Sequence, residues 1–176
     1  MKVCVVSPEP SWAVIYEAEV AKLRQALGEL PFEVHHIGST AILGIYAKPI
    51  IDILLVVQSL KSLDAKDQNM RELGYEPKGE FGIPERRYFR KDSTSGDRTH
   101  QIHSFVQGSA GAIRHLAFRD YMNCHNEAAR EYSDLKQGLA ASFPNDIQKY
   151  MNGKDAFIKQ HEAAALAWNQ RGGRDA

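Results

Sequence analysis

The segment Ile50–Val57 constrains the fold of this chain more than any other. It is apolar at every position except Asp52 and is rich in β-branched residues. Such a run is typical of a strand that is covered on both faces, because a strand with one exposed face would alternate apolar and polar residues. The segment therefore predicts a central strand in an α/β domain, with helices on both sides of its sheet.

The remaining pattern predicts elements on either side of this strand. Ser109 and Asn126 are expected as helix N-caps, and Gly28 and Gly74 as helix ends. The predicted elements are a helix over 10–27, a strand over 34–37, a helix over 60–73, a hairpin of 86–91 and 99–106 around a polar turn, and helices from 109 onward with a break at 143–145. We expect one domain over 1–170, with a helical C-terminal third, and a flexible tail over 171–176.

Charge and cysteine content limit the class of function. The chain has 22 basic and 22 acidic residues, which argues against a general nucleic-acid coat or a membrane-surface binder. Cys4 and Cys124 cannot form a disulfide framework, and a reducing compartment is the simple interpretation. No secretory signal or membrane-spanning run is recognisable. We expect a cytoplasmic protein.

A possible phosphate site lies around Asp52. The strand over 34–37 stops at Gly38-Ser39, and a turn of this kind can direct backbone N–H groups and a hydroxyl toward a phosphate. Asp52, on the following strand, could hold a magnesium ion against the same phosphate. Alternatively, Asp52 caps a loop or pairs with a buried arginine.

The same residues carry a resemblance to a known family. His36–Ala41 and Lys48–Ile53 resemble the signature of the GrpB family, within the nucleotidyltransferase superfamily. Later blocks match in order over nearly the whole chain: 79–84, 87–91, 99–103 and 114–121. The resemblance implies a nucleotidyltransferase-like mixed sheet with flanking helices. Related domains are found fused to dephospho-coenzyme A kinase.

One position departs from the superfamily pattern. Its enzymes carry two acids as Asp-x-Asp or Asp-x-Glu on this strand, whereas this chain has Leu54 in the second place. Both positions face the same way, so standard two-metal chemistry loses a ligand. His103 could compensate together with Asp52, with or without His36, which would suit manganese, iron or zinc better than magnesium. Alternatively, His103 is simply hydrogen-bonded within the sheet.

Basic residues form the other part of the predicted site. Alternation places Arg86 and Arg90 on one face of their strand and Arg87 on the other. Arg87 and Arg90 are candidate phosphate ligands because a guanidinium binds phosphate with two hydrogen bonds; a solvated edge strand is the alternative. Further candidates are Thr40 and Lys48 for phosphate, and His115 and Arg119, one helical turn apart, for the surroundings of the site.

The predicted function is transfer of a nucleotidyl group from a nucleoside triphosphate to an unknown small acceptor. Asp52 would be catalytic and would bind a divalent metal with His103, while Gly38 and Ser39 would bind phosphate. The alternative is a catalytically inactive module that binds a nucleotide or a coenzyme A-like ligand, which Leu54 favours. A single-metal phosphohydrolase is a third possibility. The expected partner is thus a phosphate-containing small molecule, with no membrane and no strong case for nucleic acid.

Overall fold

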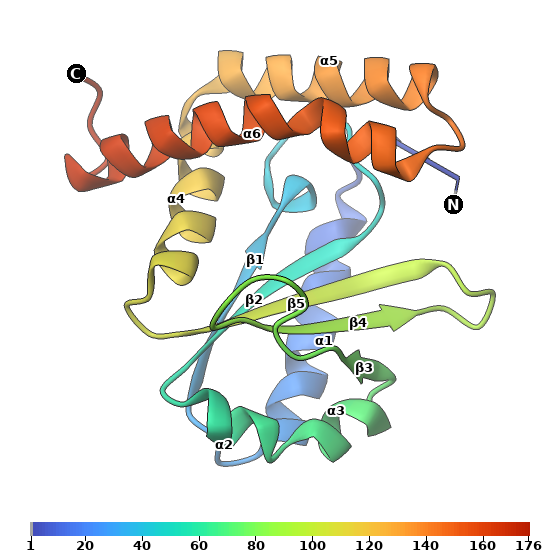
Figure 1. Ribbon diagram of the computed structural model, residues 1–176, viewed down its shortest axis with the longest axis vertical. Coiled ribbons are helices and arrows are strands. Elements are labelled where there is room, and N and C mark those ends of the chain that lie inside the picture. The colour runs from blue at the N-terminus through green and yellow to red at the C-terminus, as the bar shows by residue number, and fades with distance from the viewer. Residues whose placement is uncertain (1) are drawn as a thin grey trace.

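A five-stranded mixed sheet forms the centre of the computed structural model, which describes residues 2–176 (Figure 1). The strand order is β1-β2-β5-β4-β3, with β2 and β5 parallel and the other pairs antiparallel. The strands are β1 (Phe32–Ile37), β2 (Ile51–Val57), β3 (Tyr75–Pro77), β4 (Arg87–Asp92) and β5 (Arg98–Val106). The predicted mixed α/β fold is confirmed.

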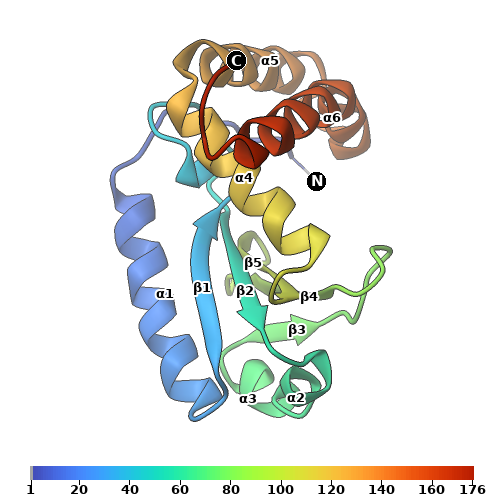
Figure 2. The ribbon, with the colours of Figure 1, turned by 90° about the vertical axis from the view of Figure 1, so that its left-hand side faces the viewer.

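Helices lie on both sides of this sheet and at one of its ends (Figures 1 and 2). They are α1 (Ser11–Leu27), η1 (Ser39–Ala41), α2 (Leu60–Asp64), α3 (Asp67–Glu72), α4 (Ala110–Cys124), α5 (Asn126–Ser142) and α6 (Ile147–Gln170). The first three α-helices pack on one face, and α4 packs on the other. The last two helices run side by side beyond the sheet and carry on from α4, which gives the helical C-terminal third.

The packing on both faces of the central strand β2 accounts for its apolar sequence. Its odd-numbered residues Ile51, Ile53, Leu55 and Val57 join the core beneath α1, α2 and α3. Leu54 and Val56 join a second core cluster with Phe105 and Ala112, beneath α4. Both faces are thus covered, as predicted, and polar residues would be tolerated only where the cover ends. Asp52 stands at that place, half-buried near the start of the strand.

Several boundaries differ from the prediction. The helix expected over 60–73 is two short helices, because the backbone of Lys66, with φ of −98° and ψ of 7°, leaves the helical conformation between them. Strand β3 was not predicted, since three residues are too few to show alternation. Ser109 is an N-cap as predicted, but His125, not Asn126, stands at the N-cap position of α5.

Residues 171–176 make contacts with the helices, and the flexibility expected of this tail stays a prediction. The Gly173 N–H donates to the Trp168 carbonyl at 3.0 Å, and His125 Nε2 lies 2.7 Å from Asp175 Oδ1.

Within residues 2–176, no helix combines the length and the apolar character needed to cross a membrane.

Candidate functional site

The Gly38 turn brings the first two predicted site residues into contact. Strand β1 ends at Ile37, which pairs with Asp52 across the sheet, and Gly38 follows with φ of +72°. A Cβ atom on residue 38 would lie 2.5 Å from Asp52 Oδ2. Both the left-handed backbone and this close approach require glycine. The chain then enters η1, which starts at Ser39.

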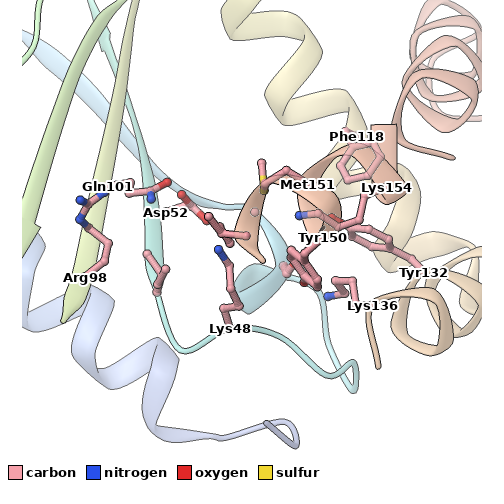
Figure 3. A pocket seen from close by; sticks show the side chains of 14 residues that line it. Lys48, Asp52, Arg98, Gln101, Phe118, Tyr132, Lys136, Tyr150, Met151 and Lys154 are labelled. Atoms are coloured by element: carbon pink, nitrogen blue, oxygen red, sulfur yellow. Dashed lines mark hydrogen bonds between the residues drawn. The ribbon is translucent and has the colours of Figure 1, made fainter. Parts of the chain in front are cut away.

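A cavity of about 380 Å³ opens beside this turn, between the sheet and the C-terminal helices (Figure 3). From the sheet side it is lined by Gly38, Ser39, Lys48, Ile50, Asp52, Arg98 and Gln101. From the helical side it is lined by Phe118, Tyr132, Lys136, Ile147, Tyr150, Met151 and Lys154. Residues far apart in the chain therefore face a common space.

The charge in this cavity is unbalanced. Asp52 is its one carboxylate, whereas Lys48, Arg98, Lys136 and Lys154 are cations. Burial lowers the pKa of Lys136 to about 7, with a further contribution from the charge of Lys154. Burial and the charge of Lys48 lower the pKa of Lys154 to about 8. Burial and repulsion between neighbouring lysines thus disfavour the positive charge of this cavity, and a bound anion would offset both effects.

Lys136 is the most unusual of these residues. Its side chain is only 1% exposed, and its Nζ atom has no hydrogen-bond partner among the residues that the structure describes. It lies over the ring of Tyr132, with Nζ 4.4 Å from the ring centroid. Lys154 lies over Tyr150 in the same way, at 4.7 Å. A buried ammonium without a partner is costly, so the cavity is suited to a ligand that supplies negative oxygen atoms.

Neither of these lysines was predicted from the sequence. Tyr132 and Lys136 on α5, like Tyr150 and Lys154 on α6, are four residues apart and share one helical face. This Tyr-x-x-x-Lys pattern, present on both helices, was the available signal. Arg98 and Gln101 were also not predicted for the cavity.

Two predicted phosphate ligands lie outside the cavity. Arg87 donates two hydrogen bonds to Asp64, at 2.6 and 3.0 Å, on the α2 side of the sheet. Arg90 donates to Glu76 at 2.7 Å, across to the edge strand β3. Each guanidinium already has a carboxylate partner, which matches the alternative interpretation of a charged strand near the sheet edge.

Thr40 and His36 support the turn from behind. His36 Nε2 and Thr40 Oγ1 are 2.9 Å apart, and the His36 ring stacks on Tyr16 with centroids 4.7 Å apart. Burial lowers the pKa of His36 to about 4, partly opposed by the charge of Asp52, so the ring is neutral at ordinary pH. Arg119 Nη1 donates to the His36 carbonyl at 3.1 Å. These three residues shape β1 and η1 and do not line the cavity.

His103 meets Asp52 from β5. Its Nε2 atom lies 3.5 Å from Asp52 Oδ1, and its ring lies 5.2 Å from that of His115, centroid to centroid. Burial lowers the pKa of His115 to about 3, helped by the neighbouring His103. His115 is therefore a neutral ring packed behind His103.

The donor set around Asp52 does not fit a two-metal centre. Within residues 2–176, no three His, Cys, Asp or Glu side chains come together in an arrangement that could hold a metal ion. A zinc site, which takes at least three protein ligands, is not supported either. Asp52 alone fits a single magnesium ion, which commonly takes one or two carboxylates and completes its shell with phosphate oxygens and water.

Comparison with known proteins agrees with this architecture. The family model described as GrpB protein matches residues 2–164. The chain belongs to the GrpB family. It is 42% identical to the YqkA protein of Bacillus subtilis over 169 residues, which covers 96% of this chain but only 49% of that relative. The chain therefore spans about half the length of this relative.

Two solved structures resemble this chain in fold. A GrpB protein from Enterococcus faecalis superposes with a TM-score of 0.89 at 40% identity, covering 95% of this chain and 99% of that one. A Cid1 poly(U) polymerase bound to MgATP superposes with a TM-score of 0.51 at 13% identity, over 74% of this chain and 45% of that one. The latter likeness shows that the fold is nucleotidyltransferase-like.

A third kind of relative is a dephospho-CoA kinase of Mycolicibacterium paratuberculosis. It is 26% identical over 188 residues, which covers 93% of this chain and 46% of that protein. A GrpB-like segment is thus about half of that larger protein.

Proposed function

We propose that this GrpB-family protein binds a nucleoside triphosphate in the cavity of Figure 3 and transfers its nucleotidyl group to a small acceptor. The observation that carries the proposal is the buried, unpartnered ammonium group of Lys136, facing the same cavity as Gly38 and Asp52. An anion between the two sides of the cavity would contact cations and a tight turn together.

The cavity suits a ligand with several phosphate groups better than a ligand with a single phosphate. Lys48 and Arg98 line the cavity from the sheet side, whereas Lys136 and Lys154 line it from the helices. Four cations against a single carboxylate match the charge of a triphosphate, and buried charge-assisted hydrogen bonds are strong. Gly38 lets the phosphate approach the backbone without a Cβ atom in the way.

Different residues of this chain would have different roles in the transfer. One magnesium ion held by Asp52 and phosphate oxygens would neutralise charge next to the reacting phosphate. Gly38 and Ser39 would position the phosphate that is attacked. Lys136 and Lys154 would stabilise the negative charge that accumulates on the leaving pyrophosphate.

A binding module without turnover is the second candidate, and Leu54 favours it. Leucine carries no carboxylate, so β2 offers a metal ion no second acid. The Leu54 side chain is instead buried, 0% exposed, in the cluster beneath α4. The basic cavity would then retain a nucleotide or a coenzyme A-like ligand without reaction. The dephospho-CoA kinase relative makes a coenzyme A-type ligand a sensible probe.

Substitution of Asp52 with Asn tests the proposal. It keeps the size of the side chain and removes its charge, so the magnesium-dependent part of the affinity for a non-hydrolysable triphosphate should disappear. We expect calorimetric titration with magnesium to show this loss. Asp155→Asn, an exposed acid paired with Lys159 on α6, is the control and should bind as the parent does.

Product analysis of the parent protein separates the candidates. Pyrophosphate release with a labelled acceptor supports transfer, and inorganic phosphate release indicates a phosphohydrolase. Saturable binding without turnover supports the binding module. If neither a nucleotide nor coenzyme A binds in the presence of magnesium, the cavity has a different ligand and the proposal is wrong.

Replacing Arg90 with Gln should leave nucleotide affinity unchanged, because Arg90 pairs with Glu76 outside the cavity. The loss of this partly exposed ion pair should cost at most about 1 kcal/mol of stability. Parallel titration and thermal melting of parent and variant measure both quantities. A clear loss of affinity with an unchanged melting curve would restore Arg90 as a phosphate ligand.

A further inference from the structure

Arg86 is a buried cation that the proposed reaction does not use. Its residue is 6% exposed, and no carboxylate within residues 2–176 forms an ion pair with it. Instead, its guanidinium donates to the carbonyls of Glu80 at 3.2 Å and Phe81 at 2.8 Å, and lies 4.9 Å from the centroid of the Tyr88 ring. A buried arginine with only neutral partners is unfavourable for stability, which calls for another role.

The loop before β4 holds this guanidinium in a fixed orientation. Phe81 and Glu85 have φ of 47° and 61°, a left-handed backbone that side chains other than glycine rarely adopt. The Glu80 carboxylate accepts the Glu85 N–H and closes the loop. Strained loops of this kind cluster at functional sites, where the strain fixes a side chain.

The remaining nitrogen of the guanidinium, Nη1, points at His103. Arg86 Nη1 lies 3.4 Å from His103 Nδ1. A guanidinium has N–H donors and no acceptor, so Nδ1 must be the nitrogen that accepts. The proton of a neutral ring then sits on Nε2, which faces Asp52 Oδ1 at 3.5 Å. The other tautomer would set an N–H against an N–H at Arg86 and a lone pair against the carboxylate at Asp52.

We propose that Arg86 is a positioning residue that holds His103 as the Nε2–H tautomer, so that His103 donates to Asp52 and does not ligate a metal ion. The expectation that His103 replaces the missing second acid is thereby reversed: Asp52 is the one side-chain ligand for a metal. His103 instead fixes the orientation of the carboxylate. The tautomer does not depend on nucleotide binding; only its consequence for metal use rests on the proposed function.

Nitrogen-15 NMR of the histidine rings tests the tautomer directly, in the full chain without nucleotide. His103→Gln identifies the His103 signals. The parent should show the Nε2–H form. Arg86→Met keeps an unbranched side chain but removes every donor, so the Nδ1–H form, which the guanidinium excludes, should become detectable beside the Nε2–H form that Asp52 still favours. Arg86→Lys restores a donor and should restore the parent form. Arg90→Met, which removes an arginine of β4 that pairs with Glu76 instead of His103, is the control that should leave the form unchanged.

Zinc titration supplies a second readout. Within residues 2–176, zinc would have only Asp52 and His103 as protein ligands here, so its binding should be weak. It should nevertheless bind Arg86→Met at least tenfold more tightly than the parent, because His103 can then present its Nε2 lone pair without setting an N–H at Nδ1 against Arg86, and His103→Gln in that background should remove the gain. An Nδ1–H ring in the parent overturns the proposal, as does zinc binding through His103 in the parent with the affinity of the variant. The parent spectrum decides the tautomer even if Arg86→Met does not fold. Absence of nucleotide binding alongside an Nε2–H ring would reject the proposed function alone.

Discussion

Replacing Lys136 with Met is expected to weaken nucleoside triphosphate binding by about 10- to 100-fold and to raise the stability of the empty protein. The loss of affinity follows from one buried charge-assisted hydrogen bond, worth about 1.5–3 kcal/mol. The gain in stability follows because the buried Lys136 ammonium has no hydrogen-bond partner within residues 2–176 and only the Tyr132 ring beside it. Met has a similar length and no charge, so unfolding should cost about 1–3 kcal/mol more.

The pH dependence of stability distinguishes this mechanism from ordinary packing. Burial lowers the pKa of Lys136 from 10.5 to about 7, so the unfolded chain binds more protons than the folded one between these pH values. The free energy of unfolding contributed by this group therefore rises from pH 7 to about pH 10. The Met variant should lack this part of the rise, which thermal melting across the pH range can measure.

Affinity should depend on pH in the opposite sense. A bound polyphosphate favours the protonated form of Lys136, so the parent should bind most tightly where the lysine is already charged and should lose affinity as the pH rises above about 7. Lys159→Met, which changes a lysine that is 73% exposed on α6, is the matched control and should match the parent. An unchanged affinity together with a lower melting temperature would make Lys136 a packing residue only.

Substitution of Leu54 with Asp is expected to destabilise the protein by about 3–5 kcal/mol or more, and magnesium should recover little of the loss. The superfamily pattern suggests the contrary, that an acid here completes a metal site. In the structure, however, Leu54 is packed with Ile37, Val56 and Phe105 under α4, with no solvent access. A carboxylate there would lose its hydration in an apolar cluster.

Two matched variants separate charge from shape at this position. Leu54→Asn has nearly the shape of Leu54→Asp without its charge, and Leu54→Ala measures the cavity alone, at about 2–5 kcal/mol. Chemical denaturation with and without magnesium compares all three. If magnesium protects the Asp variant clearly more than the parent or the Asn variant, residue 54 reaches the site and a second metal ligand can be restored there.

The parts of the site that lie close together in sequence were the parts that sequence could predict. Gly38 directly follows β1 and Asp52 lies on the neighbouring strand β2, and strand alternation with turn chemistry was enough to place them together. Alternation also separated Arg87 from Arg90 correctly. It could not show that Arg87 faces α2 or that Arg90 meets Glu76, because these contacts depend on how distant elements pack.

The helical side of the cavity could not be predicted from the sequence, for a similar reason. A lysine at position 136 or 154 in an isolated helix is ordinarily solvated. Its burial arises only when α5 and α6 pack together and enclose Tyr132 and Tyr150. The fold was therefore more predictable than the site, since each strand and helix is encoded locally whereas the basic cavity is a product of their assembly.

The chain order of the cavity has a consequence for biosynthesis. Its turn and its carboxylate lie on β1 and β2, whereas two of its cations lie on the last two helices. Domains emerge from the ribosome N-terminal part first, so a growing chain has its sheet well before it has the lysines that would retain a polyphosphate. A fragment that ends before α5 would lack these two cations and also the packing of Ile42 and Ile45 against Ala129 and Tyr132. Ligand retention would thus distinguish chains that include the final helices from shortened ones.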